Sequence, residues 1–299
     1  DGFRVMEVRL CATVPSALAS ATLNCVLFVA CLYLFTHGRL NRDAPDVVKQ
    51  RFVRVALVSA CAPLVMFGVS GASALVSRVS CTPAARLLQW VGLTSGSLSS
   101  AFPGALVPLL LTMLLFSGPL VMAYVDFDKH TPLCEQVSTR THGPRRLLLI
   151  RNLLVGPLAE EWVFRACMCP LLFAAGLTDG ANVLASCLLF GAAHVHHRFD
   201  SAEAWLGVAV QFSYTSLFGA YSSYLFLRTG LLYGPILAHA FCNFMGLPDF
   251  GGVPDHPRRR LVAAAFVFGL GSFVTLVTLD AVHRPAVFGS MFWQEHGQV

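Results

Sequence analysis

Long uncharged stretches separated by short charged links set the pattern of this chain. A transmembrane helix needs about 20 predominantly apolar residues, and we interpret the stretches near that length as about eight spans. They cover residues 10–36, 55–77, part of 87–125, 147–177, 180–195, 204–227, 229–247 and 261–279. The pattern therefore predicts an all-α fold, a polytopic membrane helix bundle of about eight transmembrane helices.

Two segments depart from this simple pattern. The stretch 87–125 is longer than one span requires, and its Ser- and Gly-rich part at 95–100 predicts an interfacial or re-entrant segment before a helix that begins near Pro103. The tail 284–299 is expected to form a short surface segment. Since the sequence contains no internal repeat and no long linker, we expect residues 1–299 to form one integral membrane domain.

Composition agrees with a membrane protein. Hydrophobic residues make up 56% of the chain and charged residues 12%, whereas soluble domains carry about 25% charged residues. The net charge of +5 is modest and indicates contact with anionic headgroups rather than nucleic acid. Fourteen of the 21 Lys and Arg residues fall on one side of the predicted spans. Since positive charge collects in the cytosol, we expect both termini on the opposite, lumenal or exterior side.

The ten cysteines do not indicate a disulfide framework or a zinc site. Most lie inside apolar stretches, where cysteine behaves as a small buried hydrophobe, and paired C-x-x-C spacing is absent from the sequence. The chain begins at Asp1 rather than methionine, which leaves open whether residues precede it. The stretch 10–36 is too long for a signal-peptide core of about 7–15 residues, so we interpret it as a retained span.

Charged residues inside the fourth span are the first candidates for chemistry, because ionisable groups at membrane depth are costly. Glu160 and Glu161 are adjacent and therefore lie on different faces of a helix, while Glu161 and Arg165 form an i,i+4 pair. Glu160 needs a partner from another helix, for which histidine is the natural candidate. The structural alternative is a salt bridge that locks the helices together.

Two later spans supply histidines. Phe190 and His194 lie one turn apart on one helix face, and His196 and His197 follow in the loop, where an interfacial role is expected.

In the seventh span, His239 and Asn243 lie one turn apart, and both can donate hydrogen bonds to a common point, as an oxyanion hole requires. Hydrogen bonding between membrane helices is the alternative role for this pair. At about 1.5 Å of rise per residue, the positions of Glu160, His194, His239 and Asn243 all fall in the predicted cytosolic half.

Taken in order, the motifs E-E-x-x-x-R, F-x-x-x-H and H-x-x-x-N resemble those of the type II CAAX prenyl endopeptidases, the Ras-converting enzyme branch of the CPBP (ABI) membrane peptidases. The resemblance covers about residues 147–247, the motif-bearing core of the expected peptidase domain. It implies removal of the C-terminal tripeptide from prenylated CAAX proteins in the endoplasmic reticulum membrane, with the site open toward the cytosol. No metal or other cofactor is implied.

The resemblance also implies residue roles. Glu160 and His194 would bind and activate a water, and His239 and Asn243 would stabilise the oxyanion. Glu161 and Arg165 would orient Glu160, with Phe190 in support of the site.

Three other hypotheses remain at this point. Glu160, His194 and His239 could ligate a catalytic zinc. Ser70 in a Gly-Val-Ser-Gly run suggests a rhomboid-like serine peptidase, although small residues in membrane helices commonly serve close packing. The buried charges could also belong to a non-enzymatic transporter or scaffold.

Overall fold

The computed structural model describes residues 12–33, 43–76, 87–94, 98–127, 144–195, 205–279 and 285–292. Every regular element among these residues is a helix, which confirms the predicted all-α fold for this part of the chain. The helices are α1 (Val14–Tyr33), α2 (Pro45–Val76), α3 (Leu87–Trp90), α4 (Leu98–Leu115), α5 (Ser117–Val125), α7 (Pro144–Ile150), α8 (Gly156–Glu161), α9 (Cys169–Ala174), α10 (Asp179–His194), α12 (Trp205–Thr229), α13 (Tyr233–Met245), α14 (Arg259–Thr278) and α15 (Pro285–Phe288). Two π-helical segments, η1 (Arg151–Val155) and η2 (Trp162–Cys167), join α7 to α8 and extend α8 toward α9.

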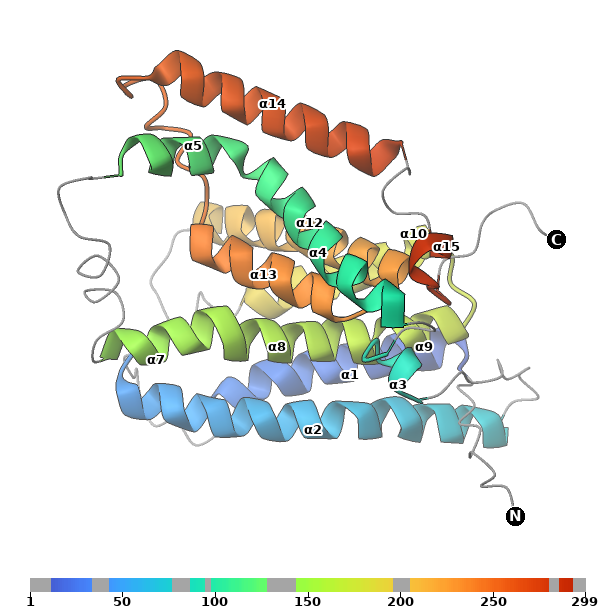
Figure 1. Cartoon of the computed structure of the whole chain (residues 1–299). Helices are drawn as coiled ribbons and strands as arrows, with labels where there is room; N and C mark the ends of the chain where they lie inside the picture. Colours follow the sequence, from blue (N-terminus) through green and yellow to red (C-terminus); the bar gives the residue numbers. More distant parts are fainter. Residues whose placement is uncertain are drawn as a thin grey trace.

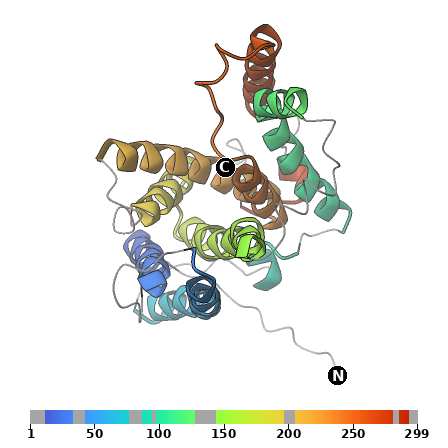
Figure 2. The same ribbon diagram turned by 90° about the vertical axis from the view of Figure 1, so that its left-hand side faces the viewer.

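The segments from α7 to α9 follow one another end to end and form a central rod (Figure 1). Figure 2, which views the bundle from its end, shows α1 and α2 on one side of this rod and α10, α12 and α13 on the others. Helices α1, α2, α10 and α12 contact η2, while α13 contacts η1 and α8. The charged motif of the fourth predicted span therefore lies inside the bundle and not on its lipid-facing surface.

Two prolines explain why the rod widens into π-helical turns. Pro157 has no N–H to donate to the carbonyl of Leu153, so the regular i to i−4 ladder is interrupted there. Immediately before it, the N–H of Gly156 donates to the carbonyl of Arg151, five residues earlier. A Cβ atom at position 156 would lie 2.9 Å from that oxygen, so glycine permits the turn. Pro170, in the first turn of α9 just after η2, likewise has no N–H to donate. π-helical turns occur frequently at functional sites.

A third proline ties the rod to α2. Pro63 lies inside α2 and leaves the carbonyl of Ser59 without its helical donor. The indole Nε1 of Trp162 donates to this oxygen at 2.8 Å. A backbone group that lipid could not satisfy is thus paired by a side chain of the rod.

The count of about eight spans is not confirmed. Three described helices are long and apolar enough to cross a membrane, α1, α2 and α14, and the pair α4 and α5 adds a fourth if the two helices, bent by 67°, form one span. Helices α10 and α13 have only 16 and 13 residues. The apolar surface is nevertheless extensive, since Leu64, Leu217 and Val267 are each about 70% exposed or more. Lipid, and not water, suits such a surface.

Two boundaries differ from the prediction. Helix α2 begins at Pro45, ten residues before the uncharged stretch, because the long side chains of its charged first turns can extend away from the apolar core. Helix α4 begins at Leu98 and continues through Pro103, and the chain bends after it, at Phe116. Residues 95–97 of the expected interfacial segment lie outside the described residues.

The prediction of a surface segment at 284–299 was wrong for the described residues 285–292. Phe288 and Phe292 are 1% and 0% exposed. The ring of Phe292 stacks on Phe226 at 5.3 Å between centroids and also contacts Trp90 and Phe173. Aromatic residues bury large areas, so this short segment after the last long helix completes the core.

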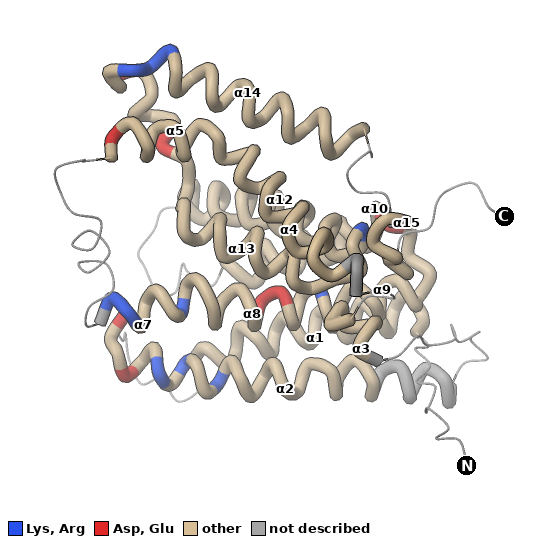
Figure 3. The backbone as a smooth tube through the Cα atoms, viewed as in Figure 1, with Lys and Arg blue, Asp and Glu red and all other residues tan. Residues whose placement is uncertain are grey.

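Lys and Arg residues gather at the end of the bundle where α2, α7 and α14 begin (Figure 3). Segments far apart in the sequence therefore present their positive charges on the same side, as the distribution of charges along the sequence predicts.

Replacing Phe292 with alanine should destabilise the fold by about 3–5 kcal/mol, because a large buried ring would leave a cavity among aromatic neighbours. The thermal unfolding midpoint of the detergent-purified protein measures this effect. Phe268→Ala is the matched control, since Phe268 is 64% exposed on α14. Equal midpoints for the two variants would contradict burial of Phe292.

Candidate active site

Glu160 and Glu161 end α8 and point in different directions, as adjacent helical residues must. The side chain of Glu161 is fully buried, whereas that of Glu160 is 21% exposed. The two carboxylates therefore have different environments, and each has its own set of neighbours.

The carboxylate of Glu161 is the centre of a buried polar network. Its Oε2 lies 3.2 Å from Nε of Arg165 and accepts a hydrogen bond from Ser222 at 2.5 Å. Its Oε1 lies 2.7 Å from Nδ1 of His239. The guanidinium of Arg165 also donates to the carbonyl of Gly219. The network connects the rod to α12 and α13, and it provides the compensation that a buried charge requires.

Aromatic rings enclose this network and hold the two histidines. The guanidinium carbon of Arg165 lies 4.3 Å from the centroid of the Phe190 ring, a cation–π contact. The same ring lies 4.6 Å from the imidazole of His194, and Phe218 lies 4.7 Å from that of His239. The side-chain orientations of both imidazoles are therefore set by packing as well as by hydrogen bonds.

Hydrogen bonds indicate which nitrogen of each imidazole faces Glu160. A carbonyl or an ionised carboxylate only accepts, so Nδ1–H of His194 donates to the Phe190 carbonyl at 2.7 Å and Nδ1–H of His239 donates to Glu161. In both residues Nε2 is then directed toward Glu160, 3.7 Å from its Oε2 in each case. This Oε2 is buried and accepts no hydrogen bond from the residues that the structure describes.

Asn243 lies in the last turn of α13, which ends at Met245 and is followed by Gly246 with φ +70°, a conformation that favours glycine. One N–H of its carboxamide donates to the carbonyl of Asn152 at 2.9 Å. Asn243 is not hydrogen-bonded to His239, but it lines the same cavity as Glu160, His194 and His239.

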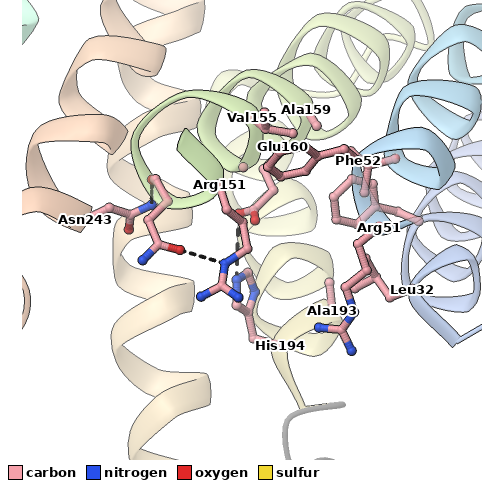
Figure 4. A pocket seen from close by; sticks show the side chains of 14 residues that line it. Leu32, Arg51, Phe52, Arg151, Val155, Ala159, Glu160, Ala193, His194 and Asn243 are labelled. Carbon is pink, nitrogen blue, oxygen red and sulfur yellow. Dashed lines mark hydrogen bonds and ion pairs between the residues drawn. The ribbon is translucent and has the colours of Figure 1, made fainter. Parts of the chain in front are cut away.

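Two cavities meet at this cluster. The larger has a volume of about 900 Å³ and lies between the rod, α4, α12 and α13. The smaller, of about 230 Å³, lies between the rod, α1, α2 and α10 (Figure 4). Four residues line both cavities, namely Asn152, Glu160, His194 and Asn243. A substrate that crosses from one cavity to the other therefore passes Glu160.

The structure shows what Glu161 and Arg165 contact. Their partners include His239, Ser222, the Phe190 ring and the carbonyl of Gly219. Both carboxylates approach the imidazole of His239, Glu161 at Nδ1 and Glu160 at Nε2. That Glu161 and Arg165 orient Glu160 stays a prediction. No group of three or more His, Cys, Asp and Glu residues in the described part of the chain is arranged to hold a metal ion. Residues 196 and 197 and the side chain of Ser70 lie outside the described residues.

Two further residues, not among those predicted from the sequence, belong to the site. Ser222 contacts Glu161 and Phe218 contacts His239. They lie one turn apart in the predicted sixth span. The available signal was a run of Gly219, Ser222 and Ser223 in an otherwise apolar helix, since small polar residues mark helix contacts in membranes.

An apolar helical bundle with a buried carboxylate–imidazole cluster between two cavities defines an integral membrane protein with an internal polar site. Comparison with known proteins identifies it further. A family model described as "Type II CAAX prenyl endopeptidase Rce1-like" matches residues 143–245, which contain all three motifs. No solved structure matches the chain significantly.

Similar sequences extend over most of the chain. CAAX prenyl protease 2 of Homo sapiens is 39% identical over 278 residues, covering 88% of this chain and 80% of that protein. CAAX prenyl protease 2 of Rattus norvegicus is 35% identical, covering 88% and 79%. The probable CAAX prenyl protease 2 of Schizosaccharomyces pombe is 30% identical, covering 82% and 86%. The chain belongs to the type II CAAX prenyl endopeptidase family and is a membrane peptidase.

The protein should unfold more readily when one partner of the buried ion pair between Glu161 and Arg165 is removed. We expect Arg165→Met to cost about 3–5 kcal/mol, because it leaves the Glu161 carboxylate buried without its cation. The double variant Glu161→Gln, Arg165→Met should recover part of this loss, since no uncompensated charge remains. Unfolding midpoints measure both, with exposed Arg260→Met as the control. If the double variant is no more stable than Arg165→Met, the loss of stability does not come from an uncompensated charge on Glu161.

Proposed function

We propose that this peptidase removes the C-terminal tripeptide from prenylated CAAX proteins by direct attack of a water molecule. The names of its relatives support the substrate class. The observation that carries the mechanism is the buried Oε2 of Glu160, which lies 3.7 Å from Nε2 of both His194 and His239. Each separation is too long for a direct hydrogen bond but is one that a bridging water can span.

Glu160 and His194 activate this water. The Glu160 carboxylate is the general base, and His194, neutral with its proton on Nδ1, accepts a hydrogen bond at Nε2. The water oxygen attacks the scissile carbonyl carbon and its proton moves to Glu160. A nucleophilic side chain is not needed for this step, which distinguishes it from serine peptidases.

His239 and Asn243 stabilise the oxyanion that forms. Because Nδ1–H of His239 is donated to Glu161, its Nε2 can donate only if the ring is an imidazolium. Asn243 gives one N–H to the Asn152 carbonyl and keeps the other for the oxyanion. Glu161 is then a positioning residue, since it acts on the reaction through His239.

The reaction ends with collapse of the tetrahedral intermediate. The C–N bond breaks, and the proton held by Glu160 passes to the leaving amine, which departs as the free tripeptide. The prenylcysteine keeps the new carboxylate. One water is thus consumed for each peptide bond cleaved.

The larger cavity suits the prenylcysteine. Its wall contains Phe218, Leu217, Tyr214 and Phe273, apolar surfaces that an isoprenoid can contact. Prenylated tails are made in the cytosol and partition into membranes through their lipid.

Sidedness follows from charge. The end of the bundle rich in Lys and Arg would face the cytosol. His194 ends α10 and Asn243 lies in the last turn of α13, so the site would open there. We further propose a single domain with about eight spans in the endoplasmic reticulum membrane, and catalysis without a metal or other cofactor.

Single substitutions test the roles with a farnesylated CAAX peptide. We expect Glu160→Gln and His194→Ala to reduce kcat/KM by about 10²–10⁴, the usual contribution of general base catalysis. His239→Ala and Asn243→Ala should each reduce it by about 10²–10³, as for loss of an oxyanion donor. Release of the tripeptide, measured by mass spectrometry, reports the rate.

The matched control is Asp255→Asn, since Asp255 is an exposed carboxylate that lines neither cavity. It should retain the parental rate. If folded Glu160→Gln cleaves the peptide as fast as the unsubstituted protein, the water-attack mechanism is wrong.

Chelation tests the absence of a catalytic metal. Activity should survive prolonged dialysis against a strong chelator, because in the proposed mechanism Glu160 and His194 activate the water directly. Loss of activity that only added zinc restores would favour the metallopeptidase hypothesis.

A further inference from the structure

The two cavities differ in charge. Among the described residues that line the larger cavity there is no Lys or Arg. The smaller cavity is lined by two arginines, Arg51 from α2 and Arg151 from η1. Figure 4 shows both side chains extending toward the part of the pocket where Ala193 and His194 lie. Two guanidinium groups from separate helices thus border one end of the path past Glu160.

A CAAX substrate is equally asymmetric about its scissile bond. The prenylcysteine on one side is apolar, and the tripeptide on the other ends in a free carboxylate. We propose that the smaller cavity holds the tripeptide and that Arg51 and Arg151 bind its C-terminal carboxylate. This inference rests on the proposed function and assigns to the site a way to select the chain end.

The length of a tripeptide is compatible with the distance between Glu160 and Arg151. Three extended residues span at most about 10–11 Å, which sets how far the carboxylate lies from the scissile carbonyl. Arg151 precedes Glu160 by nine residues, or about 14 Å along the rod. The arginine side chain is long, so its guanidinium can lie closer to Glu160 than its backbone does. When the scissile carbonyl of the prenylcysteine lies beside Glu160, the carboxylate at the end of the tripeptide is therefore within reach of Arg151.

Contacts of Arg151 prepare it for this role. Its Nη1 lies 2.8 Å from Oδ1 of Asp43, and its Nε donates to Oδ1 of Asn152 at 2.9 Å. Both contacts restrict the guanidinium, and restricted groups lose less freedom when they bind. Guanidinium groups also suit carboxylates because they offer paired, parallel donors.

A carboxylate-to-amide comparison tests the proposal. Two farnesylated peptides of the same sequence, one with a free C-terminal carboxylate and one with a C-terminal amide, are cleaved by the full chain in zwitterionic phosphatidylcholine vesicles. The unsubstituted protein should prefer the acid by about 10–100-fold in kcat/KM, mainly through KM, as expected for hydrogen bonds to a charged group.

Variants assign this preference to residues. Arg51→Gln and Arg151→Gln should each lose most of the preference while cleaving the amide at the parental rate, which also shows that they fold. Arg51→Lys should keep part of it, because the charge remains. Arg54→Gln is the matched control, one turn from Arg51 but lining neither cavity, and should keep the full preference.

Each other result overturns the inference. Equal cleavage of acid and amide by the unsubstituted protein would remove carboxylate recognition while leaving the proposed function intact. Equal loss of both peptides in the arginine variants would show a structural role or attraction to headgroups. Failure of the unsubstituted protein to cleave either peptide would refute the proposed function itself, and this proposal with it.

Discussion

The carboxylate of Glu161 is the group on which the rest of the site depends. Arg165, Ser222 and His239 all contact it, so one buried charge joins the central rod to α12 and α13. A charge in this position is costly unless every lone pair is used. The requirement restricts how the three helices can pack, and it also determines which nitrogen of His239 faces Glu160. The same contacts thus stabilise the bundle and orient a proposed catalytic group.

Helix irregularity prepares the rod for this arrangement. Pro157 and Pro170 interrupt the backbone ladder, and the π-helical segments beside them change the angular spacing of the side chains. Glu160 and Glu161 lie between the two segments. One carboxylate enters the buried network while the other borders both cavities. In the proposed mechanism the buried carboxylate, Glu161, positions His239, and the accessible one, Glu160, transfers the proton.

Much of the candidate site was predictable because membrane depth makes polar residues conspicuous. Glu160, His194 and His239 stand out against apolar neighbours, and the structure brings them within 3.7 Å of one another in the pairs described. The partners of Glu161 on other helices were not predictable. An i,i+4 spacing identifies Arg165, but nothing local indicates that Ser222 and His239, 61 and 78 residues away, also contact it. Phe292 was missed for a similar reason, since a short apolar segment near the chain end can be buried or exposed.

By itself, the sequence determined the helical class, the membrane environment and the three polar motifs. Those properties depend only on composition and on the spacing of residues within one helix, and both can be read directly from the sequence. Tertiary structure alone decided that Glu161 contacts His239, that a cavity lined by two arginines meets a larger one at Glu160, and that Phe292 enters the core. Each of these depends on how separate helices are rotated and placed against one another, and that is set by packing and by the pairing of buried charges across the whole bundle.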